Sequence, residues 1–85
     1  MLAARRGVLE IIASILSGLA ENPLKKTHVT YKANLDSRAA SKYMELLVRL
    51  HLVTRSEYDP TYFTITQKGR EFLGRYEELT KIVEI

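Results

Sequence analysis

The sequence predicts a mostly helical α+β fold, in which three helices precede a β-hairpin and a C-terminal helix. Apolar residues recur at helical spacing through the first 50 positions and again near the C-terminus. Between these regions lie two short runs rich in β-branched and aromatic residues. We expect residues 1–85 to form a single domain, because 85 residues are too few for two independent cores.

The first helix is expected over about residues 4–19. Proline cannot continue a helix and disfavours helical geometry in the residue before it, so Asn22 and Pro23 mark where this helix must have ended. Apolar residues at helical spacing predict a broad stripe that faces the core: Val8, Ile11, Ile12, Ile15, Leu16 and Leu19.

Two helices joined by a short turn are expected at about residues 26–50. Thr27 is the expected N-cap of the first, because its hydroxyl can accept a hydrogen bond from a free backbone N–H. Asn34 tolerates left-handed geometry at the end of that helix. Asp36 or Ser37 can cap the second helix. A short helix, a tight turn and a longer helix that starts with basic and hydroxyl residues are typical of a helix-turn-helix.

A β-hairpin is expected at about residues 52–66. Its strands are Leu52–Arg55 and Tyr62–Thr66, which favour extended structure, and a six-residue polar turn separates them. Tyr58 and Tyr62 can either contact DNA or pack within the hairpin, and packing is the role that we expect. A hairpin in this position corresponds to the wing of a winged helix-turn-helix.

The C-terminal helix is expected at about residues 67–83, with Thr66 as its N-cap. Apolar residues spaced four, three and four apart form a short heptad seam: Phe72, Tyr76, Leu79 and Val83. We expect this seam to be a homodimer interface, because association is the usual route by which a small domain without cysteine gains buried area.

The net charge of +3 is unevenly distributed along the chain. Residues 25–55 hold seven basic and two acidic side chains, which gives +5, whereas residues 1–24 sum to zero and residues 56–85 sum to −2. A basic block between neutral and acidic flanks indicates a surface that binds a polyanion. A solvated lysine-rich face would show the same pattern.

The helix at about residues 37–50 is expected to place its first turns in the major groove of double-stranded DNA. Arg38 can bind guanine through two hydrogen bonds or hold a phosphate. The start of the preceding helix can also host a phosphate. The candidate DNA-binding residues are Lys25, Lys26, Thr27, Lys32, Ser37, Arg38, Ser41, Lys42 and Arg55.

Two segments resemble a known family. Lys26–Leu35 (KTHVTYKANL) is similar to the turn region of small archaeal winged-helix regulators. Tyr62–Leu73 (YFTITQKGREFL) is similar to the segment in which their strand passes into a helix through Thr-x-Lys-Gly. The match covers about residues 8–79, and the family resembles ten-kilodalton archaeal chromatin-type proteins that dimerise through a long C-terminal helix. The resemblance implies DNA binding, a homodimer and an archaeal source.

The sequence departs from the family pattern in two places. Ala39 and Ala40 stand early in the third helix, where relatives tend to have bulkier residues. Glu57 and Asp59 stand at the hairpin tip in place of a basic cluster. Acidic residues repel phosphate, so we expect Arg55, at the strand end, to be the better candidate for a DNA contact in the hairpin.

Catalysis has almost no support in the sequence. The chain has no cysteine and no glycine-rich phosphate loop, and its two histidines are too few for a convincing metal site. We therefore expect no enzymatic activity, cofactor, metal or small-molecule ligand. No stretch approaches the roughly 18 uninterrupted apolar residues of a membrane span, so we expect no membrane partner and a cytoplasmic, nucleoid-associated location.

Three functions remain open. The first is a dimeric, DNA-binding transcriptional regulator. The second is a winged-helix protein-interaction module that uses its apolar C-terminal helix. The third is non-specific chromosome packaging, which predicts the same DNA contacts with little sequence preference. The basic block favours DNA, because a protein-interaction module has no need of so many cations around one helix-turn-helix.

Overall fold

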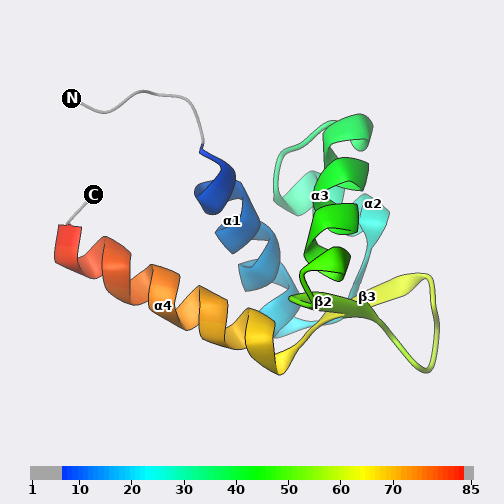
Figure 1. Ribbon diagram of the computed structural model, residues 1–85. Helices are drawn as coiled ribbons and strands as arrows, with labels where there is room; N and C mark the ends of the chain where they lie inside the picture. The colour runs from blue at the N-terminus through cyan, green and yellow to red at the C-terminus, as the bar shows by residue number, and fades with distance from the viewer. Residues whose placement is uncertain (1–6, 84–85) are drawn as a thin grey trace.

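The computed structural model describes residues 7–83, which form four helices and a three-stranded antiparallel sheet (Figure 1). This arrangement confirms the predicted fold class. The helices are α1 (Val8–Glu21), α2 (Lys26–Lys32), α3 (Ser37–Arg49) and α4 (Gln67–Val83). The strands are β1 (Leu24–Lys25), β2 (Val53–Arg55) and β3 (Tyr62–Ile65).

Helix α1 is shifted along the chain relative to its predicted range of 4–19. It begins at Val8, follows Gly7 as its N-cap, and continues to Glu21. Positions 4–6 of the predicted range lie outside the described residues. Asn22 is extended (φ −156°, ψ 151°), as expected for a residue before proline, and this extended residue ends the helix.

Strand β1 was not predicted from the sequence. It pairs antiparallel with β3, with Leu24 opposite Phe63 and Lys25 opposite Tyr62. β2 pairs with the other edge of β3, which gives the strand order β1-β3-β2. The sheet therefore ties the segment before the helix-turn-helix to the hairpin that follows it.

The predicted N-cap of α2 is wrong, because this strand fixes where α2 begins. Lys25 has extended backbone angles (φ −77°, ψ 159°) and occupies the N-cap position without a side-chain cap hydrogen bond. Thr27 already lies in the first turn of the helix. The Thr30 hydroxyl instead donates to the Lys26 carbonyl oxygen (2.8 Å), within the helix.

The turn between α2 and α3 follows the predicted chemistry. Asn34 is left-handed (φ 57°), and half-buried Leu35 packs against the core. Of the two candidate caps for α3, Asp36 fills the role, because its carboxylate accepts a hydrogen bond from the Ala39 N–H (2.8 Å). Helix α3 ends at Arg49, one residue before the predicted end, with Leu50 as its C-cap.

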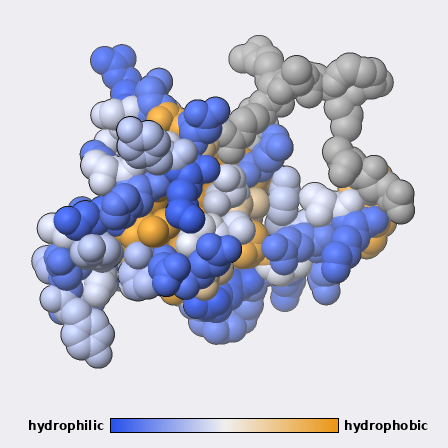
Figure 2. All heavy atoms as spheres, turned by 180° about the vertical axis from the view of Figure 1, so that it is seen from behind, coloured by the Kyte–Doolittle hydropathy of each residue, from blue (hydrophilic) through white to orange (hydrophobic). Residues whose placement is uncertain are grey.

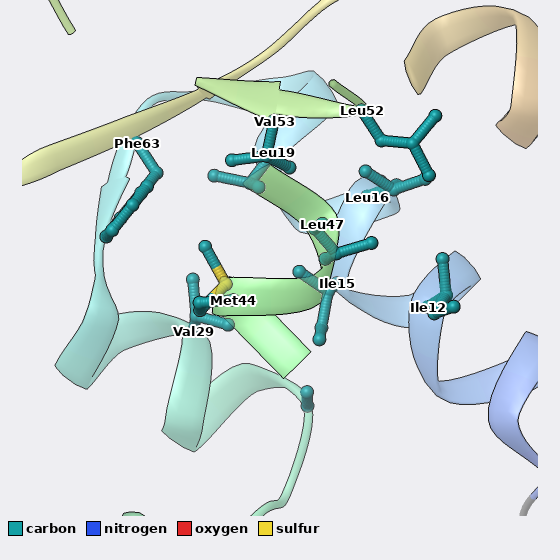
Figure 3. Packing of buried hydrophobic residues seen from close by; sticks show 11 residues of the cluster. Ile12, Ile15, Leu16, Leu19, Val29, Met44, Leu47, Leu52, Val53 and Phe63 are labelled. Carbon is teal, nitrogen blue, oxygen red and sulfur yellow. The ribbon is translucent and has the colours of Figure 1, made fainter. Parts of the chain in front are cut away.

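The core lies where α1, α2, α3 and the sheet meet (Figure 3). Its four largest fully buried side chains come from four elements: Leu16 of α1, Val29 of α2, Leu47 of α3 and Val53 of β2. Burial of each contributes roughly 1.5–3 kcal/mol. The helix-turn-helix is therefore held in place by contacts with both α1 and the hairpin.

Helix α4 starts against the core and runs beside α1, and its far end diverges from the body (Figure 1). Thr66 is its N-cap, as predicted, since its hydroxyl oxygen accepts from the Gly69 N–H (3.0 Å). Phe72 and Leu73 are half-buried and pack against the core. None of the helices between residues 7 and 83 has the length and hydropathy that a membrane span needs.

Candidate nucleic-acid interface

The start of α2, one side of α3 and the hairpin surround a surface hollow of about 300 Å³. Three of the predicted DNA-binding residues, Lys26, Ser41 and Arg55, meet there, although they lie far apart in the sequence. The hollow is lined by Lys26, Ser41, Met44, Glu45, Val48, Arg55 and Phe63. The lobe that carries these elements, on the left of Figure 2, has a mainly hydrophilic surface.

Lys26 links the two helices of the helix-turn-helix. Its ammonium donates to the Ser41 hydroxyl oxygen (2.8 Å), across 15 positions of sequence. An ammonium has three donors, so two remain for other acceptors. Because Lys26 is exposed, its charge is held above α3 while it stays accessible to an anion.

Arg55 is held at the end of β2 by two contacts. Its guanidinium lies over the Phe63 ring, 4.7 Å from the ring centroid. One of its nitrogens also donates to the Pro60 carbonyl oxygen (2.8 Å). A guanidinium has five N–H donors, so several stay available for a phosphate. These contacts reduce the side-chain entropy that binding would otherwise cost.

The remaining basic residues near α2 are not all at this surface. The Lys25 ammonium lies 5.4 Å from the centroid of the Tyr62 ring, on the sheet. Lys32 is at the last turn of α2, and its side chain lies against Gly18 of α1. The structure therefore does not bring Lys32 to the hollow, and Thr27, which is exposed in the first turn of α2, does not line it either.

The outer face of α3 carries exposed basic residues. Arg38, Lys42 and Arg49 follow one another at spacings of four and seven, which places them in one stripe, with Glu45 between them. Arg38 and Lys42 make no side-chain hydrogen bond or ion pair with another described residue. Ser37 is exposed at the start of the helix. Arg49 was not selected from the sequence, although its spacing from Arg38 already places it on this stripe.

The alanines early in α3 face into the domain. Ala40 is fully buried and Ala39 is half-buried. Their small size therefore serves the close packing of α3 and leaves the exposed stripe unaffected.

The tip of the hairpin is held by side-chain hydrogen bonds and is acidic. The Ser56 hydroxyl oxygen accepts from the N–H groups of Tyr58 (3.1 Å) and Asp59 (3.4 Å). One carboxylate oxygen of Asp59 accepts from the Thr61 hydroxyl (2.7 Å) and N–H (3.0 Å). These hydrogen bonds, together with the positive charge of Lys25, lower the pKa of Asp59 despite slight desolvation. An ionised Asp59 repels phosphate.

Tyr58 does not pack within the hairpin, contrary to expectation. Its side chain is 98% exposed, because the hydrogen-bonded turn directs it away from the sheet. Tyr62, by contrast, is half-buried on β3, next to Lys25. The burial of residues in a six-residue turn depends on its hydrogen bonds, which residue type alone does not specify.

The predicted dimer seam divides into two parts. Phe72 and Tyr76 are half-buried, and Phe72 packs against the core of its own chain. Leu79 and Val83 are 54% and 53% exposed, and Ile82 beside them is 80% exposed. The apolar surface that is open on this helix therefore lies in its last two turns.

Comparison with known proteins gives consistent matches. A family model described as winged helix-turn-helix matches residues 5–84. An uncharacterised protein of Methanocaldococcus jannaschii is 30% identical over 79 residues, which cover 93% of this chain and 78% of that protein. A second protein of the same organism is 28% identical over 81 residues, or 95% of this chain, but the chain spans only 37% of its length.

Solved structures share the fold. Sso10a-2, a DNA-binding protein from Sulfolobus solfataricus, superposes with a TM-score of 0.79 and 34% identity over 93% of this chain and 83% of its own. The adhesin competence repressor of Streptococcus pyogenes gives a TM-score of 0.69 at 21% identity, over 86% of this chain and 56% of that one. At this identity the second likeness concerns the fold alone.

Proposed function

The chain belongs to the winged helix-turn-helix family, and from that premise we propose that it binds double-stranded DNA as a homodimeric transcriptional regulator. In this proposal α3 lies in the major groove. The observation that carries it is the meeting of Lys26 of α2, Ser41 of α3 and Arg55 of β2 around one surface hollow, on the helix that also carries the exposed basic stripe. The similarity to a protein described as DNA-binding supports the same function.

The basic residues divide into two roles in this proposal. Arg38 and Lys42, at the start of the exposed stripe on α3, contact base edges or the phosphates that border the groove. Lys26 and Arg55 flank α3 and contact phosphates. Because each neutralised phosphate releases counterions, affinity falls steeply with salt concentration. Arg49 extends the stripe and adds a further phosphate contact.

The homodimer forms through the open end of α4. Leu79, Ile82 and Val83 are large apolar side chains, each more than half exposed to water in the isolated chain. Burial of such side chains against a second copy is favourable by about 25 cal/mol per Å² of apolar area. A dimer would present two α3 helices to DNA, as regulators that bind paired half-sites do. Such a protein would act at the nucleoid of its cell.

A protein-interaction module is the second candidate, and the wing tip favours it. Fully exposed Tyr58 lies between Glu57 and Asp59 on a turn fixed by hydrogen bonds. Tyrosine is frequent in the centres of protein interfaces. The basic surface around α3 has no role in this alternative, so we rank it below DNA binding.

Fluorescence anisotropy with a labelled random duplex of about 30 base pairs, titrated at several salt concentrations, tests the proposal. We expect binding at low salt whose logarithmic dependence on salt has a slope of about −9 for the dimer, if Lys26, Arg38, Lys42, Arg49 and Arg55 of each chain neutralise one phosphate each. Absence of binding at low salt would exclude DNA binding and leave the protein-interaction module.

Sequence preference separates a regulator from a packaging protein. A selection from a random duplex pool should enrich one motif, and specific binding should exceed non-specific binding by about 10³-fold or more at equal salt. Binding of similar strength to every duplex, with no enriched motif, would indicate chromosome packaging.

A further inference from the structure

The end of α3 and the start of α4 are joined by a compact set of hydrogen bonds. The Thr66 hydroxyl donates to the His51 carbonyl oxygen (2.6 Å), and the Thr66 N–H donates to the Leu52 carbonyl oxygen (3.1 Å). The Lys68 ammonium donates to the Leu50 carbonyl oxygen (2.9 Å). Three successive carbonyl groups after α3 are therefore bound by two residues at the start of α4.

The chain after α3 is shaped to present these carbonyl groups. His51 is left-handed (φ 63°), a conformation that few residues other than glycine adopt. The His51 N–H donates to the Val48 carbonyl oxygen (3.0 Å), and the Leu52 N–H donates to the Leu47 carbonyl oxygen (2.9 Å). The end of α3 is thus closed by its own backbone, and its outward carbonyl oxygens are free to accept from α4.

Gly69 brings α4 into direct contact with this segment. A Cβ at this position would collide with the Leu52 carbonyl oxygen and would lie 2.7 Å from a side-chain carbon of Ile65. Gly69 is the only buried residue of α4, and its N–H donates to the Thr66 hydroxyl oxygen (3.0 Å). The backbone of α4 at Gly69 therefore packs directly on the backbone at Leu52, with no flexible side chain between them.

We propose that Thr66, Lys68 and Gly69 are positioning residues that fix the direction of α4 relative to α3. In a dimer joined through α4, this junction sets the separation of the two α3 helices. That separation determines the spacing of the DNA half-sites, a consequence that rests on the proposed function. Positioning gives the Thr-x-Lys-Gly segment a role beyond the capping of a helix.

The length of α4 makes this angle important. Its 17 residues extend about 25 Å, so a tilt of roughly 10° at Thr66 moves its far end by about 4 Å. That displacement is comparable with the rise of about 3.4 Å per base pair of DNA. A loose junction would therefore let the two α3 helices accommodate half-sites at several separations.

Distance measurement between spin labels tests the junction without DNA. The chain has no cysteine, so Glu45→Cys on α3 and Glu78→Cys on α4 give two unique attachment sites, both exposed. Labelled protein is diluted with unlabelled protein, so that each dimer carries one labelled chain. We expect one narrow distance distribution for the parent. We expect Thr66→Val to broaden it or shift its mean by about 3 Å, because Glu78 lies about 18 Å along the helix from Thr66.

Matched variants separate positioning from a general loss of stability. Thr66→Ser keeps the hydroxyl and should restore the narrow distribution. Thr80→Val removes a hydroxyl that donates only within α4, to the Glu77 carbonyl oxygen, and should leave the distribution unchanged. If Thr66→Val does not fold, Lys68→Met replaces it in the distance measurement. Lys68→Met keeps the aliphatic part of the side chain and removes only the ammonium, so we expect a smaller change in the distance distribution. An unaltered distribution in folded Thr66→Val or Lys68→Met protein would overturn the inference.

Selection from a random duplex pool tests the consequence for DNA. The parent should enrich paired half-sites at one separation, and Thr66→Val should enrich the same half-site at several separations. Enrichment of a single, unchanged separation by Thr66→Val would overturn this consequence. If the parent enriches no duplex, the proposed function fails, whereas the spin-label distances still decide whether the junction fixes the angle.

Discussion

Arg38 and Lys42 are the side chains on which DNA binding should depend most. Both are exposed near the start of α3, and neither has a side-chain partner among residues 7–83. Their charges are therefore available to DNA without the loss of an existing contact. The side chains of Lys26 and Arg55, in contrast, are already held in place by hydrogen bonds.

The double replacement of Arg38 and Lys42 by alanine should weaken DNA binding by at least about tenfold, because each base or phosphate contact contributes about 1–3 kcal/mol. The salt slope should become shallower by about 4, because a dimer loses two phosphate contacts from each chain. Anisotropy titration measures both quantities. The melting temperature should change little, because neither side chain packs in the core.

The matched control is the replacement of Arg70 and Lys81 by alanine, which removes the same charge from the exposed face of α4 opposite Leu79. This control should retain most of the affinity. An equal loss in both double variants would mean that net charge, and not the position of the cations on α3, determines binding.

Asp59 is the residue whose ionisation the fold favours. The Thr61 hydroxyl and N–H lower its pKa, so its contribution to stability is present above the pKa of the unfolded state and is lost as the pH falls through the folded-state pKa. An NMR titration of the Asp59 carboxyl carbon should give a pKa below the ordinary value of about 3.9.

Thr61→Val should raise this pKa toward its ordinary value, because it removes the largest cause of the shift. Thr64→Val on β3 is the comparison variant, and it should leave the titration unchanged. A Thr61→Val titration that coincides with that of the parent would show that the hydroxyl contact does not hold the carboxylate.

At the scale of elements, the two helices of the helix-turn-helix start in different ways. Helix α3 has a side-chain cap, Asp36, whereas α2 follows directly from strand β1 and has none. A sequence pattern identifies the first kind of start, because cap and helix are neighbours in the chain. It does not identify the second kind, because the extended residue Lys25 is fixed by pairing with Tyr62.

This difference predicts unequal effects of two similar substitutions. Asp36→Ala should lower the free energy of unfolding by about 1 kcal/mol, because the Ala39 N–H loses its acceptor. Thr27→Ala should change it by less than about 0.5 kcal/mol, since Thr27 is exposed and caps nothing. Chemical denaturation measures both values, and equal losses would contradict the assigned start of α2.

At the scale of the whole molecule, the exposed end of α4 decides how copies associate. Leu79→Lys places a charge in the proposed interface and should convert the dimer to a monomer, as light scattering would show. Glu77→Lys, on the opposite face of the helix, also adds positive charge and should leave the dimer intact. A monomeric parent would show that the open seam does not join two copies.

The order of the four helices and the hairpin could be derived from the sequence, whereas strand β1 could not. Helical periodicity, turn residues and the caps Asp36 and Thr66 are local signals, and the structure follows them. The candidate site was only partly predictable. Spacing placed Arg38 and Lys42 on one exposed face, but no local signal showed that Lys26 and Arg55 flank the same hollow or that Lys32 lies against α1.

The sequence by itself determined the fold class, the helix-turn-helix and the basic character of its middle third, because these depend on residue type and on spacings within a few turns. Only the tertiary structure decided the presence of β1, the start of α2, the exposure of Tyr58 and the fixed junction of α3 with α4. Each of these depends on hydrogen bonds or packing that close only when the chain is folded. Leu24 is a strand residue because Phe63 lies beside it, and Gly69 is required because the Leu52 carbonyl oxygen occupies the space of a Cβ.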